Sequence, residues 1–188
     1  GTVLGTVLGA LASLLLSFSF GAVAIVVSCT TGSSWPLWLA ANGLDASPIN
    51  NSNDREVEAV IAMAKKNKNV VRIIIGNETQ LQNTVPREKL VAYLDQARKS
   101  LKKTKIPVST AEPWDYWLMH PELANHVDYV AIHILPYWAE VPAEEAVDYV
   151  LSRHEAVKIS FPKKQVMIAE TGWPSDGPQR GAAKATLA

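Results

Sequence analysis

Two apolar runs that each end in a glutamate constrain the fold of this chain most strongly. Val70–Gly76 is apolar apart from one arginine and leads into Asn77 and Glu78, and Val166–Ala169 leads directly into Glu170. Apolar runs of this length are typical of strands covered on both faces of a parallel sheet. Because parallel strands end at the same edge of a sheet, the pattern predicts that the two carboxylates converge there.

Helical patterns alternate with these runs from residue 35 onward. Val57, Val60, Ile61 and Ala64 have the spacing of a helix that lies on a sheet, with Asn53 as its expected N-cap. Further helices are expected from Pro86 to Leu101, over a short stretch at 121–125, and from Pro142 to Leu151. Strands are expected at 36–44, 70–76, 106–110, 129–134 and 165–169.

This alternation predicts right-handed βαβ units and an α/β fold with a parallel sheet. Functional residues in such folds collect at the carboxyl ends of the strands. The polar and aromatic residues that follow the expected strands are Glu78, Glu112, His133, Tyr137 and Glu170.

Composition excludes several classes of site. The 18 basic and 18 acidic residues cancel, so the net charge does not favour nucleic acid as a partner. Cys29 is the only cysteine, and the four histidines lack metal-ligand spacing, so we expect neither a metal nor another cofactor.

Residues 1–34 differ from the domain expected at 35–188. Val3–Val27 is almost continuously apolar, and no charge precedes Asp45, so this segment is long enough to cross a hydrocarbon core of roughly 30 Å as a helix. The alternatives are a signal peptide, a lipoprotein processing site that ends at Cys29, a buried helix or strand pair of a soluble core, and a gene fragment. We expect a membrane-anchored or exported protein of the periplasm or cell envelope.

Aromatic residues accompany the expected carboxylate pair. The chain has 6 tryptophans and 3 phenylalanines, and Trp114, Trp117, Trp138 and Trp173 fall near strand ends, where indole faces can stack on sugar rings. Cleavage of a glycosidic bond needs one acid that protonates the leaving oxygen and a second that stabilises or attacks the anomeric carbon. The residues therefore favour glycoside chemistry, while structural and other roles of the carboxylates stay open.

Several motifs carry a resemblance to a known family. Gly76-Asn77-Glu78-Thr79 and Ile168-Ala169-Glu170-Thr171-Gly172-Trp173-Pro174 resemble the two catalytic signatures of glycoside hydrolase family 17, the β-1,3-glucanases and glucanosyltransferases. The stretches at 53–56, 108–114 and 133–138 resemble its bacterial branch in the same order. His133 and Leu135 stand where the plant-type enzymes usually carry asparagine and tyrosine, which favours a glucan-processing enzyme of bacterial type.

The resemblance implies a retaining (β/α)8 barrel with Glu78 as the general acid/base and Glu170 as the nucleophile, their carboxyl groups about 5 to 5.5 Å apart. The substrate would be a β-glucan oligosaccharide or polysaccharide. Asn77 would hold the sugar 2-hydroxyl, and Glu112 would tune the nucleophile or serve as a structural acid. The expected substrate-binding residues are Asn77, Glu112, Trp114, His133, Tyr137, Trp138 and Trp173, with packing as the alternative for each aromatic residue.

The recognisable strands correspond to strands three to seven of such a barrel, so the barrel is incomplete in these 188 residues, against about 250 for a typical one. Two hypotheses follow. The chain is either an active retaining hydrolase or transglycosylase, or a non-catalytic fragment or glucan-binding remnant. Sequence alone does not separate hydrolysis from transfer.

Overall fold

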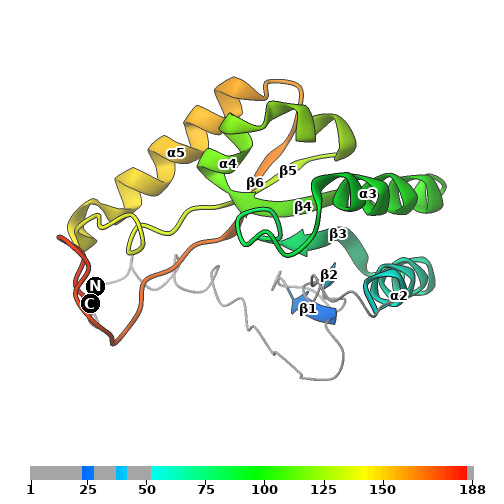
Figure 1. The fold of residues 1–188 in the computed structure, drawn as a ribbon, viewed down its shortest axis with the longest axis horizontal. Coiled ribbons are helices and arrows are strands. Elements are labelled where there is room, and N and C mark those ends of the chain that lie inside the picture. The colour runs from blue at the N-terminus through cyan, green and yellow to red at the C-terminus, as the bar shows by residue number, and fades with distance from the viewer. Residues whose placement is uncertain (1–22, 28–36, 42–51, 186–188) are drawn as a thin grey trace. The chain divides into compact units, whose positions relative to one another are not determined.

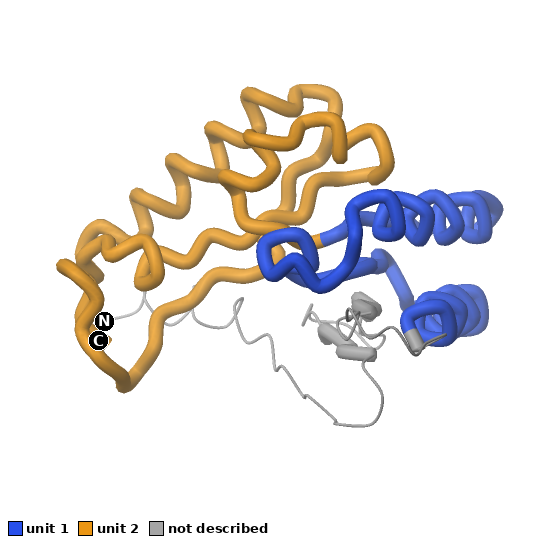
Figure 2. Tube along the Cα trace, viewed as in Figure 1, with its two compact units in different colours: residues 1–110 blue, residues 111–188 orange. Residues whose placement is uncertain are grey.

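The computed structural model describes residues 23–27, 37–41 and 52–185 (Figure 1). The chain divides into two compact units, residues 1–110 and 111–188 (Figure 2). Strand β4, Val108–Pro113, begins in the first unit and ends in the second. Each unit combines strands with helices that pack against them.

The first unit contains the strand expected at 70–76. β3, Val70–Asn77, pairs in parallel with β2, Leu37–Ala41, and the amide of Ile73 donates to the carbonyl of Pro107, 3.0 Å away. β1, Val23–Val27, pairs with β2 in the antiparallel sense, which departs from an all-parallel sheet. These five residues belong to the expected membrane segment 3–27, and residues 1–22 lie outside the described part of the chain.

None of the helices in the described ranges is long and apolar enough to span a membrane. α2, Ser52–Lys66, and α3, Arg87–Leu101, pack against each other and against β3. The four apolar residues expected to form the inner face of α2 are all buried, which confirms that stripe. Asn53 was expected to cap α2, but the helix already includes Ser52, so Asn53 lies inside the first turn.

In the second unit, the end of β4 pairs in parallel with β5, Val130–His133, which pairs in parallel with β6, Val166–Glu170. The expected helix after Pro142 is a 3₁₀ turn, Ala143–Glu145, followed by α5, Ala146–Ser160. A 3₁₀ helix, Pro121–His126, occupies the expected short helix. α4, Trp114–Met119, was not expected, because six residues are too few to show a helical period.

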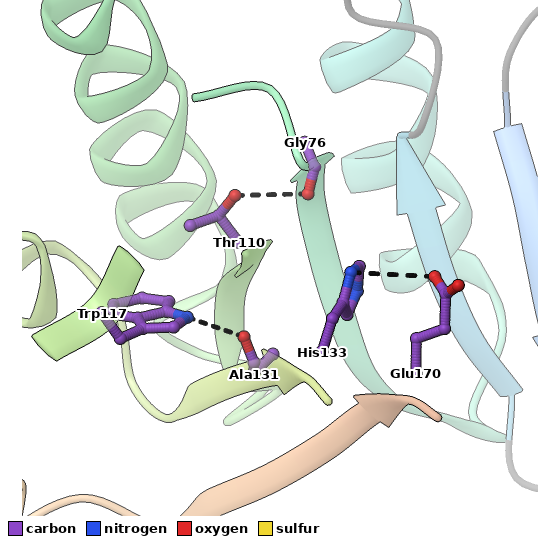
Figure 3. Close-up of polar contacts among 6 residues, drawn as sticks. All are labelled: Gly76, Thr110, Trp117, Ala131, His133 and Glu170. Atoms are coloured by element: carbon purple, nitrogen blue, oxygen red, sulfur yellow. Dashed lines mark hydrogen bonds and ion pairs between the residues drawn. The ribbon is translucent and has the colours of Figure 1, made fainter. Parts of the chain in front are cut away.

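Trp117 anchors α4 to the core of the second unit. Its side chain is fully buried, and its indole Nε1 donates to the carbonyl of Ala131, 2.8 Å away (Figure 3). Phe161, just after α5, meets the indole edge-on with 6.3 Å between ring centroids. α4 is thereby held on β5, and α5 packs against α4 and β6. All four residues of β5 are buried, as expected for a central parallel strand.

The turn after β3 requires a glycine at Gly76. This residue has φ +84°, and a Cβ placed on it would lie 3.0 Å from Thr79 Oγ1 and 3.2 Å from Leu90 Cδ1. Its carbonyl accepts a hydrogen bond from Thr110 Oγ1 of β4, 3.2 Å away (Figure 3). The backbone that leads into Asn77 and Glu78 is therefore fixed from two sides.

A polar cluster joins α2 to α3. The Tyr93 hydroxyl donates to Asp54 Oδ1, 2.7 Å away, and Lys89 Nζ lies 3.3 Å from the same oxygen. The hydrogen bond from Tyr93, reinforced by Lys89, holds the pKa of Asp54 below its ordinary value. Burial, followed by the hydrogen bond to Asp54, raises the pKa of Tyr93. The cluster is therefore strongest when Asp54 is ionised and Tyr93 is protonated.

We expect Tyr93→Phe to lower the stability of the protein slightly at neutral pH, because the ionised Asp54 loses a donor. Because the pKa of Asp54 is lower in the folded protein than in the unfolded chain, its ionised form stabilises the fold at pH values above the unfolded pKa. This stabilisation is lost as the pH falls through the folded pKa. The difference between wild type and variant in denaturant unfolding should therefore shrink below about pH 4. In an Asp54→Asn background, which has no titrating carboxyl at this position, the difference should not depend on pH.

Gly76→Ala should destabilise the protein by about 1 to 3 kcal/mol, since alanine is strained at positive φ and its methyl group meets Thr79 and Leu90. Gly172→Ala is the matched control, because a Cβ there meets no atom within 4 Å. Denaturant unfolding of both variants measures the difference. Equal midpoints for the two variants would contradict this account of the β3 turn.

Candidate active site

Glu78 follows β3 directly, as the sequence predicted. Its φ is +53°, a left-handed conformation that non-glycine residues rarely adopt, and its carbonyl accepts the amide of Gln82, 2.9 Å away. The next residue, Thr79, is buried, and its carbonyl accepts the amide of Thr84, 3.0 Å away. Asn77 is the last residue of β3 and is half-buried. Backbone outliers of this kind concentrate at functional sites, where the surrounding structure holds them.

Glu170 is the last residue of β6, in the second unit, and its side chain is 46% exposed. His133 is the last residue of β5, and its side chain is only 2% exposed. The imidazole Nδ1 lies 3.7 Å from Glu170 Oε2, as Figure 3 shows. The structure therefore brings together two of the expected site residues, one buried and one open to solvent.

Glu112 occupies a different environment from the other two glutamates. It is fully buried within β4, where it pairs in register with Ile132 of β5, and the next residue, Pro113, pairs with His133. A buried carboxyl group needs hydrogen-bond or charged partners, because desolvation of an unpaired charge is costly. Its position suits a residue that supports the strand ends, and its action on the nucleophile stays a prediction.

Three of the expected substrate-binding residues form an aromatic cluster, defined by Tyr137, Trp138 and Trp173. Tyr137 is buried and meets each of the two indoles edge-on, with 5.7 Å between ring centroids in both pairs. Its hydroxyl donates to the carbonyl of Pro178, and Trp173 Nε1 donates to the carbonyl of Lys184, 3.2 Å away. The segments that follow β5 and β6 are thus joined through their aromatic side chains.

Arginines cover part of the indole surface in this unit. The Arg180 guanidinium lies 4.5 Å from the ring centroid of Trp138, whose side chain is otherwise well exposed. Arg153 of α5 lies 4.9 Å from the ring centroid of Trp114 and 4.9 Å from that of Tyr149. Neither arginine was among the sequence candidates, because no local pattern indicates a stacking contact between distant parts of a chain.

Each unit carries a carboxyl group at or after the end of a strand. In the second unit, the exposed carboxylate of Glu170 at the end of β6 can attack an electrophilic carbon. In the first unit, Glu78 directly follows β3. An exposed indole such as that of Trp138 can bind a sugar ring. The sequence pattern already pointed to His133 and Glu170, since each closes a strand, but not to the contact between them.

Several proteins from other organisms are similar to this chain in sequence. Cell surface mannoprotein MP65 of Candida albicans is 29% identical over 74% of the chain and 38% of its own length. The probable glucan endo-1,3-beta-glucosidase btgC of Aspergillus flavus is 26% identical over 75% of the chain and 21% of its own length. The chain thus spans less than two fifths of either relative. Both organisms are fungi, so these matches do not support the expected bacterial branch.

Among solved structures, a glycoside hydrolase family 17 β-1,3-glucanosyltransferase from Rhizomucor miehei aligns with a TM-score of 0.64 and 27% identity. The alignment covers 72% of this chain and 51% of that one, which confirms the expected fold, a (β/α) barrel in incomplete form. The family model of the BtgE/BtgC glycoside hydrolase domain matches residues 15–188. The chain belongs to this glycoside hydrolase family and carries part of a family 17 domain.

Proposed function

We propose that this chain carries the reacting groups of a retaining glycosidase or transglycosylase that acts on β-1,3-glucan. The observation that carries the proposal is Glu170, a solvent-open carboxylate at the carboxyl end of β6 in a chain of a glycoside hydrolase family. Glu78, at the end of β3, is the proposed partner. Retention of configuration requires the two carboxyl groups to lie about 5 to 5.5 Å apart in the assembled enzyme.

In the first step, an oxygen of Glu170 forms a bond to the anomeric carbon while the bond to the leaving oxygen breaks. Protonated Glu78 gives its proton to that oxygen, which takes the electron pair of the broken bond. In the second step, Glu78 removes a proton from water or from a sugar hydroxyl, whose oxygen displaces Glu170 from the anomeric carbon. Asn77 holds the 2-hydroxyl of the reacting sugar.

The substrate class rests on the relatives. One is a probable glucan endo-1,3-beta-glucosidase, and an active-site mutant of the Rhizomucor miehei glucanosyltransferase was solved in complex with laminaritriose. In this chain, the aromatic cluster presents the exposed indole of Trp138 as a flat apolar surface for a glucose ring. Trp114 is proposed for the rim, although Arg153 already covers part of its ring.

We place the protein outside the cytoplasm, at the cell surface or in the cell envelope. A relative that shares 29% of the aligned residues is a cell surface mannoprotein, and β-glucan is an extracellular polymer. The proposed anchoring through residues 3–27 concerns a segment of which the structure describes 23–27 only.

The second candidate is a non-catalytic glucan-binding remnant. The alignment with the Rhizomucor miehei structure covers 51% of that chain. The two candidates differ in whether the chain releases or transfers sugar.

We expect Glu170→Gln to abolish turnover of reduced β-1,3-gluco-oligosaccharides and Glu78→Gln to lower it about 10²- to 10⁴-fold. Mass spectrometry of the products separates hydrolysis, which gives shorter chains, from transfer, which also gives longer ones. Glu155→Gln, which removes an exposed carboxylate from α5, is the control and should keep full activity. Product formation that survives Glu170→Gln would reject the mechanism, and glucan binding by a folded but inactive wild type would support the remnant.

Azide distinguishes the roles of the two glutamates. With an activated aryl β-glucoside, Glu170→Gly plus azide should give the α-glycosyl azide, because azide replaces the missing nucleophile in a single displacement. Glu78→Ala plus azide should give the β-glycosyl azide, because azide then attacks the glycosyl-enzyme. The opposite anomers would mean that the roles are reversed.

A further inference from the structure

We propose that His133 is a positioning residue for the Glu170 carboxylate, with the imidazole Nδ1 holding Oε2 so that Oε1 is presented to the anomeric carbon. The inference deepens the proposed function and rests on it. The contact is drawn in Figure 3, where the side chains from the ends of β5 and β6 point toward each other, with 3.7 Å between Nδ1 and Oε2.

The backbone brings the two residues into register. Ile132 pairs with Ile168, but the next residue of β5, His133, pairs with Glu170, so Ala169 is an extra residue in β6. An extra residue of this kind is a β-bulge, which redirects side chains and is over-represented beside active sites. Without the bulge, His133 would pair with Ala169. The amide of Ile134 also donates to the carbonyl of Glu170, 3.0 Å away, which fixes this register beyond the bulge.

Burial gives the two partners different roles. The His133 side chain is 2% exposed, so the surrounding protein fixes the ring, whereas the Glu170 side chain is 46% exposed and has room to change rotamer. A fixed donor beside the carboxylate restricts the rotamers of the carboxylate. Correct positioning of the attacking atom contributes much of an enzyme's rate enhancement. His133 is too enclosed to offer broad contact surface to a sugar.

The distance between the imidazole and the carboxylate determines what the contact can do. At 3.7 Å the pair is within reach of an ion pair but longer than a hydrogen bond. Catalytic hydrogen bonds are often long before substrate binds and tighten in the complex. In the reaction, the Nδ1 proton stays on His133 in both steps. It stabilises Oε2 while Oε1 bonds to the anomeric carbon, and again when Glu170 departs with the electron pair of that bond.

Two substitutions distinguish the role of imidazole Nδ1 from that of Nε2. Asparagine places its Nδ2 near the position of imidazole Nδ1, whereas glutamine places its Nε2 near imidazole Nε2. His133→Asn should therefore keep the contact with Glu170, and His133→Gln should lose it. His133→Leu removes both donors and shows the effect of an apolar side chain of similar size.

The first measurement is covalent labelling of Glu170 by a 2-deoxy-2-fluoro-β-glucosyl fluoride, followed by intact-protein mass spectrometry. His133→Gln and His133→Leu should slow labelling about 10²-fold, as expected for a misplaced nucleophile, while His133→Asn stays within tenfold of wild type. On oligosaccharides the loss should fall on kcat and leave KM nearly unchanged. Equal labelling rates in the asparagine and glutamine variants would overturn the inference.

The second measurement does not need activity. In protein labelled with ¹⁵N-histidine, the His133 imidazole nitrogen signals should shift on Glu170→Ala, while those of the half-buried His120, His126 and His154 stay constant. Signals of His133 that do not respond would overturn the inference whether or not the chain is active. A wild type that shows this response but is never labelled would reject the proposed function, and the positioning role with it.

Discussion

The pairing of β5 with β6 determines what meets at the functional end of the second unit. β5 is wholly buried, so its register is fixed by apolar packing on both faces, and β6 takes its position from β5. The bulge at Ala169 then sets which side chain of β6 reaches the end of β5. The aromatic segments that follow both strands start from that same edge. A change in this register would separate the buried imidazole from the carboxylate.

Much of this architecture was predictable from local pattern. The strands β3, β5 and β6 and the helices α2 and α3 have strong periodicity or unbroken apolar runs, and burial in the structure matches this pattern for all of them except β6. The apolar run of β6 predicted a strand covered on both faces, but its residues are only half-buried and Glu170 is exposed. β1 was not predictable, because an apolar run such as 3–27 looks alike whether it forms a helix or a strand, and only pairing with β2 decides. The apolar face predicted for α5 is not the face that the structure buries. Val147 and Leu151 are exposed, and the buried residue of this helix is Val157.

The positions of the candidate residues near strand ends were predictable, but their contacts were not. Strand ends in the sequence pattern indicated Glu78, His133 and Glu170 as candidates, and the structure has Glu78 directly after β3, His133 as the last residue of β5 and Glu170 as the last residue of β6. A bulge adds one residue without any sequence signal, so the pairing of His133 with Glu170 was not predictable. The left-handed backbone at Glu78 is likewise a property of the turn that Gly76 and Thr79 build around it.

The indoles show why aromatic residues near a strand end do not by themselves define a sugar site. Trp117 is buried and donates to Ala131, so it is part of the core. Trp114 and Trp138 each have an arginine against the ring, and a guanidinium and a glucose ring compete for the same face. Trp138 differs because it is well exposed and touches Tyr137, the buried ring of the aromatic cluster. The proposed stacking of a sugar on Trp138 therefore competes with Arg180, and Tyr137 supports the indole whichever of the two lies against it.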